Sequence, residues 1–295
     1  MFHRRQFQLR LPQRTLTLGK RTLVMGVLNV TPDSFSDGGL FLNVDAAVAH
    51  AVAMEAAGAD IIDVGGESTR PGSLGVSVEA ELQRVLPVIE KLKGKIRVPI
   101  SVDTSKSEVA EAAASAGAEI VNDVTALGND PRIAEVVRRR KLGLILMHMR
   151  GKPRTMQKAP FARDVLRDVA KGLRHAVTMA RRAGVLKSQI VLDPGIGFGK
   201  SFEQNCELLA RLPKLARLGY PLLVGTSRKS FIGKALENSE SRVGSATDRI
   251  WGTAATVAAS ILQGAHIVRV HDVAEMAQVA RVSDAVASPR SMGRR

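Results

Sequence analysis

Polar side chains recur at the ends of short apolar runs along this 295-residue chain. The first run, residues 23–30, includes Asn29 and stops at Thr31-Pro32-Asp33, where proline removes a donor that a sheet would need. A carboxamide at the end of a buried strand needs a partner, which can be a turn or a bound ion or ligand. Later runs end in or near Asp63, Asp103, Asn122, Asp123, His148, Asp193, Ser227, Lys229, Arg269 and His271. This repetition favours one shared site.

Two groups of these side chains differ in the chemistry that they could do. Arg269 and His271 can donate hydrogen bonds to a polyanion such as a diphosphate, and Asn29 offers oxygen to Mg²⁺. The second group suits a flat guanidine-like heterocycle, because a carboxylate accepts two N–H groups while an amide and an ammonium serve ring nitrogen and carbonyl groups. Its members are Asp103, Asn122, Asp193 and Lys229.

The elements that must position these residues alternate regularly. Apolar runs typical of buried parallel strands cover residues 23–30, 60–66, 98–104, 119–124, 143–149, 189–194, 221–226 and 265–271. Helical patterns cover residues 43–57, 77–93, 106–116, 131–140, 162–182, 203–218, 248–263 and 273–287, and 229–245 is a longer connection. Strand-then-helix eight times predicts an α/β fold, a single-domain (β/α)8 TIM barrel, whose strand ends converge on one face. A doubly wound open sheet is the alternative, but it usually has fewer strands.

The net charge of +15 raises the question of nucleic-acid binding. Nine of these fifteen charges lie in residues 1–21 and 286–295, which contain no acidic residue. We expect residues 1–20 to be a basic segment, either a short peripheral strand or frayed, and 288–295 to be a disordered basic tail. The barrel domain would then span 21–287. Attraction of anionic substrates explains the charge more simply than specific nucleic-acid binding.

Several other classes are excluded by what the sequence lacks. No apolar run reaches the roughly 18 residues of a membrane span, and the first residues lack the apolar core of a secretory signal, so we expect a cytoplasmic protein. The sequence contains no H-E-x-x-H or C-x-x-C zinc motif. Gly195-Ile-Gly-Phe-Gly199 lacks the lysine and Ser/Thr spacing of a Walker loop, and we expect it to turn beside a ligand.

The strand ends and their loops also form a series of motifs in a fixed order. They are VLNVTPDSFSDGG at 27–39, DVGGESTRPG at 63–72, VDT at 102–104, VNDV at 121–124, MHM at 147–149, LDPGIGFGK at 192–200, GTSRK at 225–229 and RVHD at 269–272. From about residue 21 to 287, this series resembles the dihydropteroate synthases of the pterin-binding enzyme family. The resemblance implies a (β/α)8 barrel, a homodimer, Mg²⁺ as cofactor and a role in folate biosynthesis.

The resemblance also implies a reaction and roles for individual residues. The reaction joins 4-aminobenzoate to (7,8-dihydropterin-6-yl)methyl diphosphate, releasing diphosphate and forming 7,8-dihydropteroate. Asn29 would be the Mg²⁺ ligand. The pterin diphosphate would bind Thr69, Asp103, Asn122, Asp193, Lys229, Arg269 and His271. The 4-aminobenzoate site, where sulfonamides also bind, would include Phe35, Arg70, Pro71, Phe198 and Ser227. Catalytic roles would fall to Lys229, Arg269, His271 and Asp103.

Two alternatives stay open at this point. A barrel similar to the methyltetrahydrofolate methyltransferases would keep the pterin-binding Asp and Asn residues, but it would lack the loops at 31–35 and 68–71. A pterin-binding paralogue without catalytic activity is the non-enzyme alternative, and here every matched site position is filled.

Overall fold

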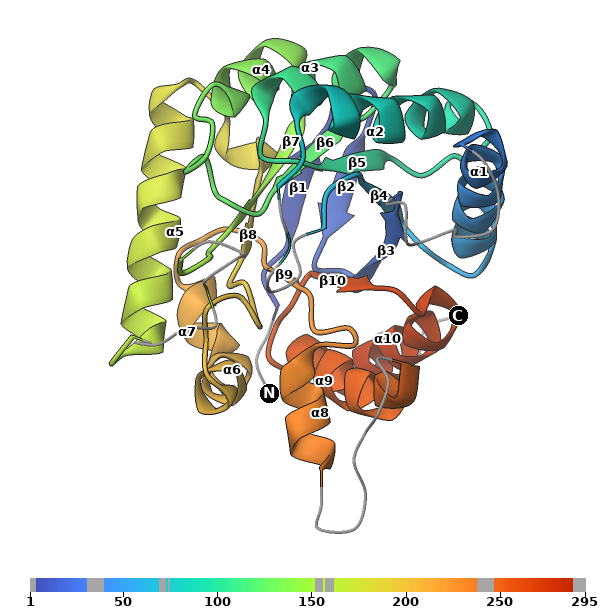
Figure 1. The fold of residues 1–295 in the computed structure, drawn as a ribbon. Helices are drawn as coiled ribbons and strands as arrows, with labels where there is room; N and C mark the ends of the chain where they lie inside the picture. Colours follow the sequence, from blue (N-terminus) through green and yellow to red (C-terminus); the bar gives the residue numbers. More distant parts are fainter. Residues whose placement is uncertain are drawn as a thin grey trace.

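The computed structural model describes residues 4–30, 40–68, 73, 75–151, 156, 162–237 and 247–288. Parallel strands run through its centre in the order β8-β7-β6-β5-β4-β3-β10-β9. A parallel bridge between Leu192 and Leu222 joins the two outermost strands of that order and brings the sheet round into a barrel (Figure 1). The strands are β3 (Leu23–Asn29), β4 (Ile61–Gly65), β5 (Ile100–Asp103), β6 (Ile120–Asp123), β7 (Gly143–Met147), β8 (Ile190–Asp193), β9 (Leu223–Val224) and β10 (Ile267–Val270).

Helices surround this barrel and cover the outer faces of its strands (Figure 1). They are α1 (Leu40–Ala56), α2 (Val78–Leu92), α3 (Ser107–Ala116), α4 (Ile133–Arg140), α5 (Val165–Arg182), α6 (Phe202–Ala210), α7 (Leu212–Ala216), α8 (Ser230–Leu236), α9 (Ile250–Leu262) and α10 (Val273–Ala287). The architecture is therefore the (β/α)8 barrel that the alternating pattern predicts. None of the described helices combines the length and the apolar composition needed to cross a membrane.

Local sequence signals account for where several helices begin and end. Ser77 caps α2, since its Oγ accepts a hydrogen bond from the backbone N of Ala80 at 3.2 Å. Asp164 caps α5 in the same way through the backbone N of Arg167. Gly58 follows α1 with a φ of 108°, a left-handed conformation that glycine adopts without steric cost.

Three elements differ from the pattern that the sequence predicts. The helix expected over 203–218 is split at Arg211, because Pro213 lacks the N–H that a continuous helix would need there. The strand expected over 221–226 is only two residues long. The connection expected over 229–245 contains a helix, α8, whose apolar face includes the buried Phe231 and Ile232.

The N-terminal segment forms an antiparallel hairpin of β1 (Phe7–Arg10) and β2 (Thr15–Leu18). Leu9 and Leu18 are fully buried. They belong to a second apolar cluster with residues from the amino-terminal halves of the barrel strands, including Met25, Ile61, Ile120 and Ile267. The hairpin therefore closes the amino-terminal end of the barrel. Of the two expectations for residues 1–20, residues 4–20 contain short strands and are not frayed, and their leucines complete this cluster.

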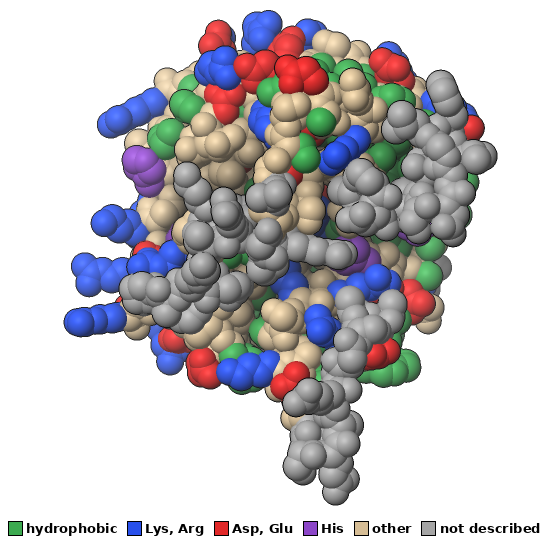
Figure 2. All heavy atoms as spheres, in the orientation of Figure 1, with side chains coloured by type: hydrophobic (Ala, Val, Ile, Leu, Met, Phe, Trp, Pro, Cys, Tyr) green, Lys and Arg blue, Asp and Glu red, His purple; other side chains and the backbone are tan. Residues whose placement is uncertain are grey.

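Basic residues of the N-terminal segment are also bound to the barrel. Arg4 Nη2 lies 2.7 Å from Asp284 Oδ1 on α10. The Arg21 guanidinium pairs with Asp60 before β4. Elsewhere, basic and acidic side chains are interspersed over the face seen in Figure 2, with Lys and Arg most prominent along the edge formed by α5. Of the basic tail expected at 288–295, only Ser288 lies within the described residues.

Candidate functional site

The carboxyl ends of the barrel strands bring several predicted site residues into one layer. Sheet register places Asn29 beside Gly65, Gly65 beside Asp103, and Asp103 beside Asn122. Four neighbouring strands thus present two amides and a carboxylate at the same height, because parallel strands in register align their ends. Asp193 ends β8 at the height of Met147 on β7.

Arg269 of β10 reaches across the barrel to two carboxylates. Its Nε donates to Asp63 Oδ2 at 2.7 Å, and its Nη2 donates to Asp103 Oδ2 at 2.8 Å. Burial raises the pKa of the Asp103 carboxyl, and the positive charge of Arg269 opposes that rise. The same two carboxylates raise the pKa of Arg269 against the effect of its own burial. This ion-pair network holds a guanidinium in a defined position at the centre of the site.

Asn122 joins the same network from β6. Its Nδ2 donates to Asp63 Oδ2 at 3.0 Å, and the residue is buried. Within the described part of the chain, the side-chain hydrogen bond of Asn122 is made by its Nδ2 and not by its amide oxygen. An acceptor is therefore left for a ligand.

Asp193 and the glycine-rich turn after it form the opposite side of the site. The Oδ1 atom of Asp193 accepts a hydrogen bond from the backbone N of Gly195 at 2.7 Å. Burial raises the pKa of Asp193, and the charge of Lys229 opposes this. Gly195 has a φ of 66°, and a Cβ there would lie 2.0 Å from the carbonyl O of His148. Only glycine fits at this position, so the turn at 195–199 packs directly against the end of β7. The expectation that this turn lies beside a ligand stays a prediction.

Lys229 lies directly beside this turn. Its Nζ sits 4.4 Å from the centroid of the Phe198 ring, a cation–π distance, and donates to the carbonyl O of Ile196. Burial lowers the pKa of Lys229 to about 8, while Asp193 works in the other direction. An ammonium, a carboxylate and an aromatic ring are thereby brought together from β8, its loop and the end of β9.

Ser227 and His271 meet between β9 and β10. Ser227 Oγ lies 3.0 Å from His271 Nδ1 and accepts from the backbone N of His271 at 3.2 Å. Between Ser227 and Lys229, Arg228 has a φ of 60° and is anchored by an ion pair to Asp272, with Nε 3.0 Å from Oδ2. That anchor fixes the turn which carries Ser227 and Lys229 on either side of it.

Lys200 is a site residue that the sequence analysis did not single out. Its Nζ donates to the carbonyl oxygens of Gly195 at 2.8 Å, Phe198 at 3.0 Å and His148 at 3.2 Å. Burial lowers the pKa of Lys200 to about 7. A single buried ammonium therefore holds the glycine-rich turn to the end of β7.

Asn29 is the predicted Mg²⁺ ligand. A Cβ added at Gly65 would lie 3.9 Å from both Asn29 Oδ1 and Asp103 Oδ2, so both oxygens border the space left by that glycine. Among the described residues there is no group of three His, Cys, Asp or Glu side chains that could hold a metal. Mg²⁺ usually keeps several waters and binds one or two protein oxygens together with substrate phosphates, and the oxygens at this position fit that mode.

Four predicted site residues, Phe35, Thr69, Arg70 and Pro71, lie outside the described residues. The other predicted residues all lie at the carboxyl-terminal mouth of the barrel. One group lies around Arg269 and a second around Lys229, while Ser227 and His271 form a separate pair and Asn29 lies at the end of β3.

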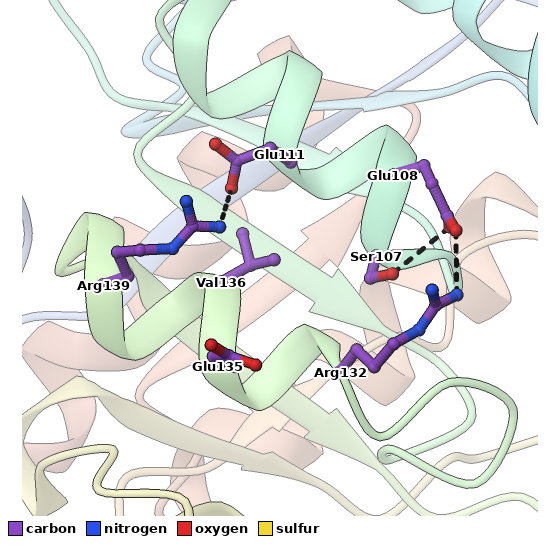
Figure 3. Close-up of a pocket in the computed structure, with 7 residues that line it drawn as sticks. All are labelled: Ser107, Glu108, Glu111, Arg132, Glu135, Val136 and Arg139. Carbon is purple, nitrogen blue, oxygen red and sulfur yellow. Dashed lines mark hydrogen bonds and ion pairs between the residues drawn. The ribbon is translucent and has the colours of Figure 1, made fainter.

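A surface pocket of about 260 Å³ lies elsewhere, between α3 and α4 on the outside of the barrel (Figure 3). Four of its charged side chains are paired with one another: Arg132 with Glu108, and Arg139 with Glu111, each at 2.8 Å. None of the strand-end residues lines it. This pocket is separate from the candidate site.

Comparison with known proteins identifies the family of the barrel. The family model described as "Pterin binding enzyme" matches residues 25–271. The dihydropteroate synthase of Synechocystis is 50% identical over 91% of this chain and 91% of its own length. That of Escherichia coli K12 is 48% identical over 90% of this chain and 92% of its own length.

Solved structures agree with these matches. A Yersinia pestis dihydropteroate synthase in complex with a sulfonamide drug has a TM-score of 0.88 and 43% identity, covering 96% of this chain and 100% of that one. A Xanthomonas albilineans dihydropteroate synthase with 4-aminobenzoic acid has a TM-score of 0.87 and 44% identity, covering 96% and 98%. The latter enzyme in complex with 7,8-dihydropteroate has a TM-score of 0.84 and 42% identity, covering 95% and 98%.

Proposed function

This chain belongs to the family of pterin-binding enzymes, and we infer that it catalyses dihydropteroate synthesis in folate biosynthesis. It is a transferase that joins 4-aminobenzoate to (7,8-dihydropterin-6-yl)methyl diphosphate and releases diphosphate. Similarity over about nine tenths of the chain supports this activity. The observation in the fold that carries it is the meeting of buried Asp and Asn side chains with the half-buried Lys229 and Arg269 at one barrel mouth.

The pterin is the flat guanidine-like heterocycle that this donor and acceptor set suits. In our proposal the Asp193 carboxylate accepts two N–H groups of the pterin, Asn122 accepts a third through its amide oxygen, and Lys229 donates to the ring carbonyl. Asp103 lies beside Asn122 in register and completes this edge of the pocket. The raised pKa of Asp193 supports the assignment, because a buried carboxylate short of donors gains stability when a ligand supplies N–H groups.

Bond cleavage transfers negative charge to the departing diphosphate. Arg269 and His271, from the end of β10, stabilise that charge by hydrogen bonds and electrostatic attraction. Asn29 would hold Mg²⁺, which supplies charge neutralisation to the diphosphate oxygens when bound. The electron-rich pterin stabilises the positive methylene carbon as the carbon–oxygen bond breaks, so the aromatic amine of 4-aminobenzoate attacks without strong activation. The amine then loses a proton.

We place 4-aminobenzoate against Phe198 and Ser227. Phe198 lies within the glycine-rich turn with Lys229 Nζ over its ring, which puts an aromatic face next to the proposed pterin position. Phe35, Arg70 and Pro71 belong to the same proposed site through the sequence resemblance alone.

The test is an assay of diphosphate release with both substrates present. Release should require 4-aminobenzoate and Mg²⁺, and the R269A variant should lose most of it. A pterin-binding protein without activity would release no diphosphate. A methyltransferase-like barrel would bind a pterin yet leave the diphosphate ester intact, so either outcome would overturn the proposed reaction.

We also propose that the chain forms a homodimer. Large apolar side chains are exposed on three consecutive helices: Leu236 on α8, Trp251 and Leu262 on α9, and Val282 and Val286 on α10. Trp251 is 81% exposed, which is unusual for so large an apolar surface. Sedimentation should give a dimer mass for the wild type and a monomer mass for W251E. A monomeric wild type at micromolar concentration would contradict the proposal.

A further inference from the structure

Asp63 is a fully buried carboxylate that the proposed chemistry does not use directly. It lies two residues before the end of β4, opposite Val27 on one side and Ser101 on the other. Its exposed fraction is 0%, whereas Arg269 above it keeps 22% of its side chain exposed. Asp63 is thus one layer deeper in the barrel than Asp103 and cannot touch a ligand at the mouth.

Its Oδ2 atom nevertheless holds two residues of the site. That atom accepts from Arg269 Nε at 2.7 Å and from Asn122 Nδ2 at 3.0 Å. Its Oδ1 is buried without a hydrogen-bond partner in the described part of the chain. A buried carboxylate left half satisfied is costly, so its contribution lies in those two contacts and not in general stability.

Each contact fixes the orientation of a group that faces the ligand. An amide can present either its NH₂ or its oxygen, and with NH₂ donating to Asp63 the oxygen of Asn122 is the atom available to accept. The Arg269 guanidinium has five N–H donors in a planar fork. With Nε on Asp63 and Nη2 on Asp103, the plane of the fork is fixed and Nη1 is left for an anion.

We propose that Asp63 is a positioning residue that sets the amide orientation of Asn122 and the guanidinium plane of Arg269 together. Through it, the pterin-binding and diphosphate-binding sides of the site share one buried atom, Oδ2. The identity of the two ligands rests on the proposed function above, whereas the contacts of Asp63 Oδ2 with Arg269 and Asn122 are observed in the structure.

The competing explanation is that Asp63 only balances the charge of Arg269. The two explanations predict opposite changes in the affinity for inorganic diphosphate when the charge of Asp63 is removed. The D63N variant keeps the size of the side chain and removes its negative charge. If Asp63 were only a counter-charge, D63N would leave the site more positive and would bind inorganic diphosphate more tightly. If it positions Arg269, diphosphate affinity should fall roughly tenfold or more, since two charge-assisted contacts are disturbed.

Calorimetry with Mg²⁺-diphosphate and, separately, with 6-hydroxymethylpterin would decide between them. We expect D63N to lose roughly tenfold in affinity for both probes. The matched control is S101A, on the register partner of Asp63 in the same buried layer, whose hydroxyl makes no hydrogen bond to the described residues. S101A should bind both probes as the wild type does. Unchanged or tighter diphosphate binding by D63N would overturn the proposal.

A second comparison covers the case in which D63N does not fold. D63L/R269M removes both buried charges together, while R269M alone leaves Asp63 to orient Asn122. Pterin affinity should be several-fold weaker in D63L/R269M than in R269M, and equal affinities would contradict the role of Asp63. If the wild type itself bound neither probe, the proposed function would fail instead.

Discussion

Two carboxylates at the barrel mouth are buried with few hydrogen-bond donors, so donors from a ligand would stabilise their charged forms. Burial raises the pKa values of Asp103 and Asp193, which means that water no longer stabilises their charged forms well. Arg269 compensates Asp103 by a direct ion pair, whereas Asp193 has one backbone N–H and a more distant Lys229. Asp193 is therefore the carboxylate with the most to gain from new donors.

We predict that D193N abolishes measurable pterin binding without unfolding the protein. The amide keeps an acceptor for the backbone N of Gly195, but it loses charge-assisted bonds worth about 1.5–3 kcal/mol each. Removing a buried charge should leave the midpoint of thermal unfolding unchanged or slightly raised. Calorimetry with a pterin measures the effect, and wild-type affinity in D193N would rule out the assignment.

The sequence located the residues at strand ends, Asp63 among them, but not which residues hold the others in position. Asp103, Asn122 and Asp193 could be predicted because a polar residue closing an apolar run is visible locally. The part played by Asp63 could not, because its two partners are 206 and 59 residues away and only the closed barrel brings them together. Lys200 was hidden for a related reason: it binds backbone carbonyls, which leave no trace in the sequence.

On the scale of the elements, the position of the turn after β8 is fixed by one cation, the ammonium of Lys200. The carbonyls of Gly195, Phe198 and His148 all accept from Lys200 Nζ, so the turn and the end of β7 share that ammonium. Because Phe198 carries the proposed 4-aminobenzoate contact, the position of the turn should affect that substrate more than the pterin.

For K200M we expect the KM for 4-aminobenzoate to rise roughly tenfold and pterin affinity to change less. Three carbonyls lose a charged donor, and a single such loss costs about 1–3 kcal/mol, so the variant should also unfold at lower temperature. The control is K171M, which replaces an exposed lysine on α5. Steady-state kinetics with each substrate varied in turn measures the split, and an equal rise in both KM values would show that Lys200 does not act through the turn.

The predicted boundaries of helices agree with the structure where the sequence has a strong cap or a clear periodicity. They differ from it where tertiary contacts determine the helix. Ser77 fixes the start of α2 by a local hydrogen bond, and that start could be predicted. The α8 helix could not, because seven residues give too short a pattern to stand out from a connection. Its buried face depends on packing near α9, where Ile232 lies close to Gly252.

On the scale of the whole molecule, the candidate site lies at the carboxyl-terminal end of the barrel, and a buried apolar cluster closes the amino-terminal end. The hairpin of β1 and β2 supplies that closure, and its four-residue strands are too short to be recognised as core from sequence. The barrel could therefore be predicted from the sequence, whereas the hairpin that closes its amino-terminal end could not.

Removing residues 1–20 should destabilise the barrel, contrary to what a frayed end would do. Leu9 and Leu18 are fully buried, and each such side chain contributes about 1.5–3 kcal/mol. The loss should be a sizeable part of the roughly 5–15 kcal/mol that stabilises a typical domain. Urea unfolding measures it, with Q8A as the control at an exposed position of the same hairpin. A truncated chain with an unchanged unfolding midpoint would show that the hairpin is dispensable.

The same closure should make stability depend on pH through His266, which precedes β10. Its Nδ1 accepts from the backbone N of Leu222 at 3.1 Å, and its Nε2 lies 2.9 Å from the carbonyl O of Arg5. This pairing requires the neutral ring with its proton on Nε2. Burial, with Arg4 adding to it, lowers the pKa of His266 to about 4, against about 6.5 in an unfolded chain.

Between those two pH values the unfolded chain binds more protons at this histidine than the folded chain does. The free energy of unfolding therefore falls as the pH drops from about 6.5 towards 4, and His266 should account for about 1–2 kcal/mol of the loss between pH 7 and 5. The H266Q variant should be less stable than the wild type at pH 7 but should lose less on going to pH 5. H175Q, at an exposed histidine of α5, should keep the wild-type pH dependence. Urea unfolding at the two pH values gives all three slopes, and an H266Q slope equal to that of the wild type would mean that His266 does not couple the hairpin to protonation.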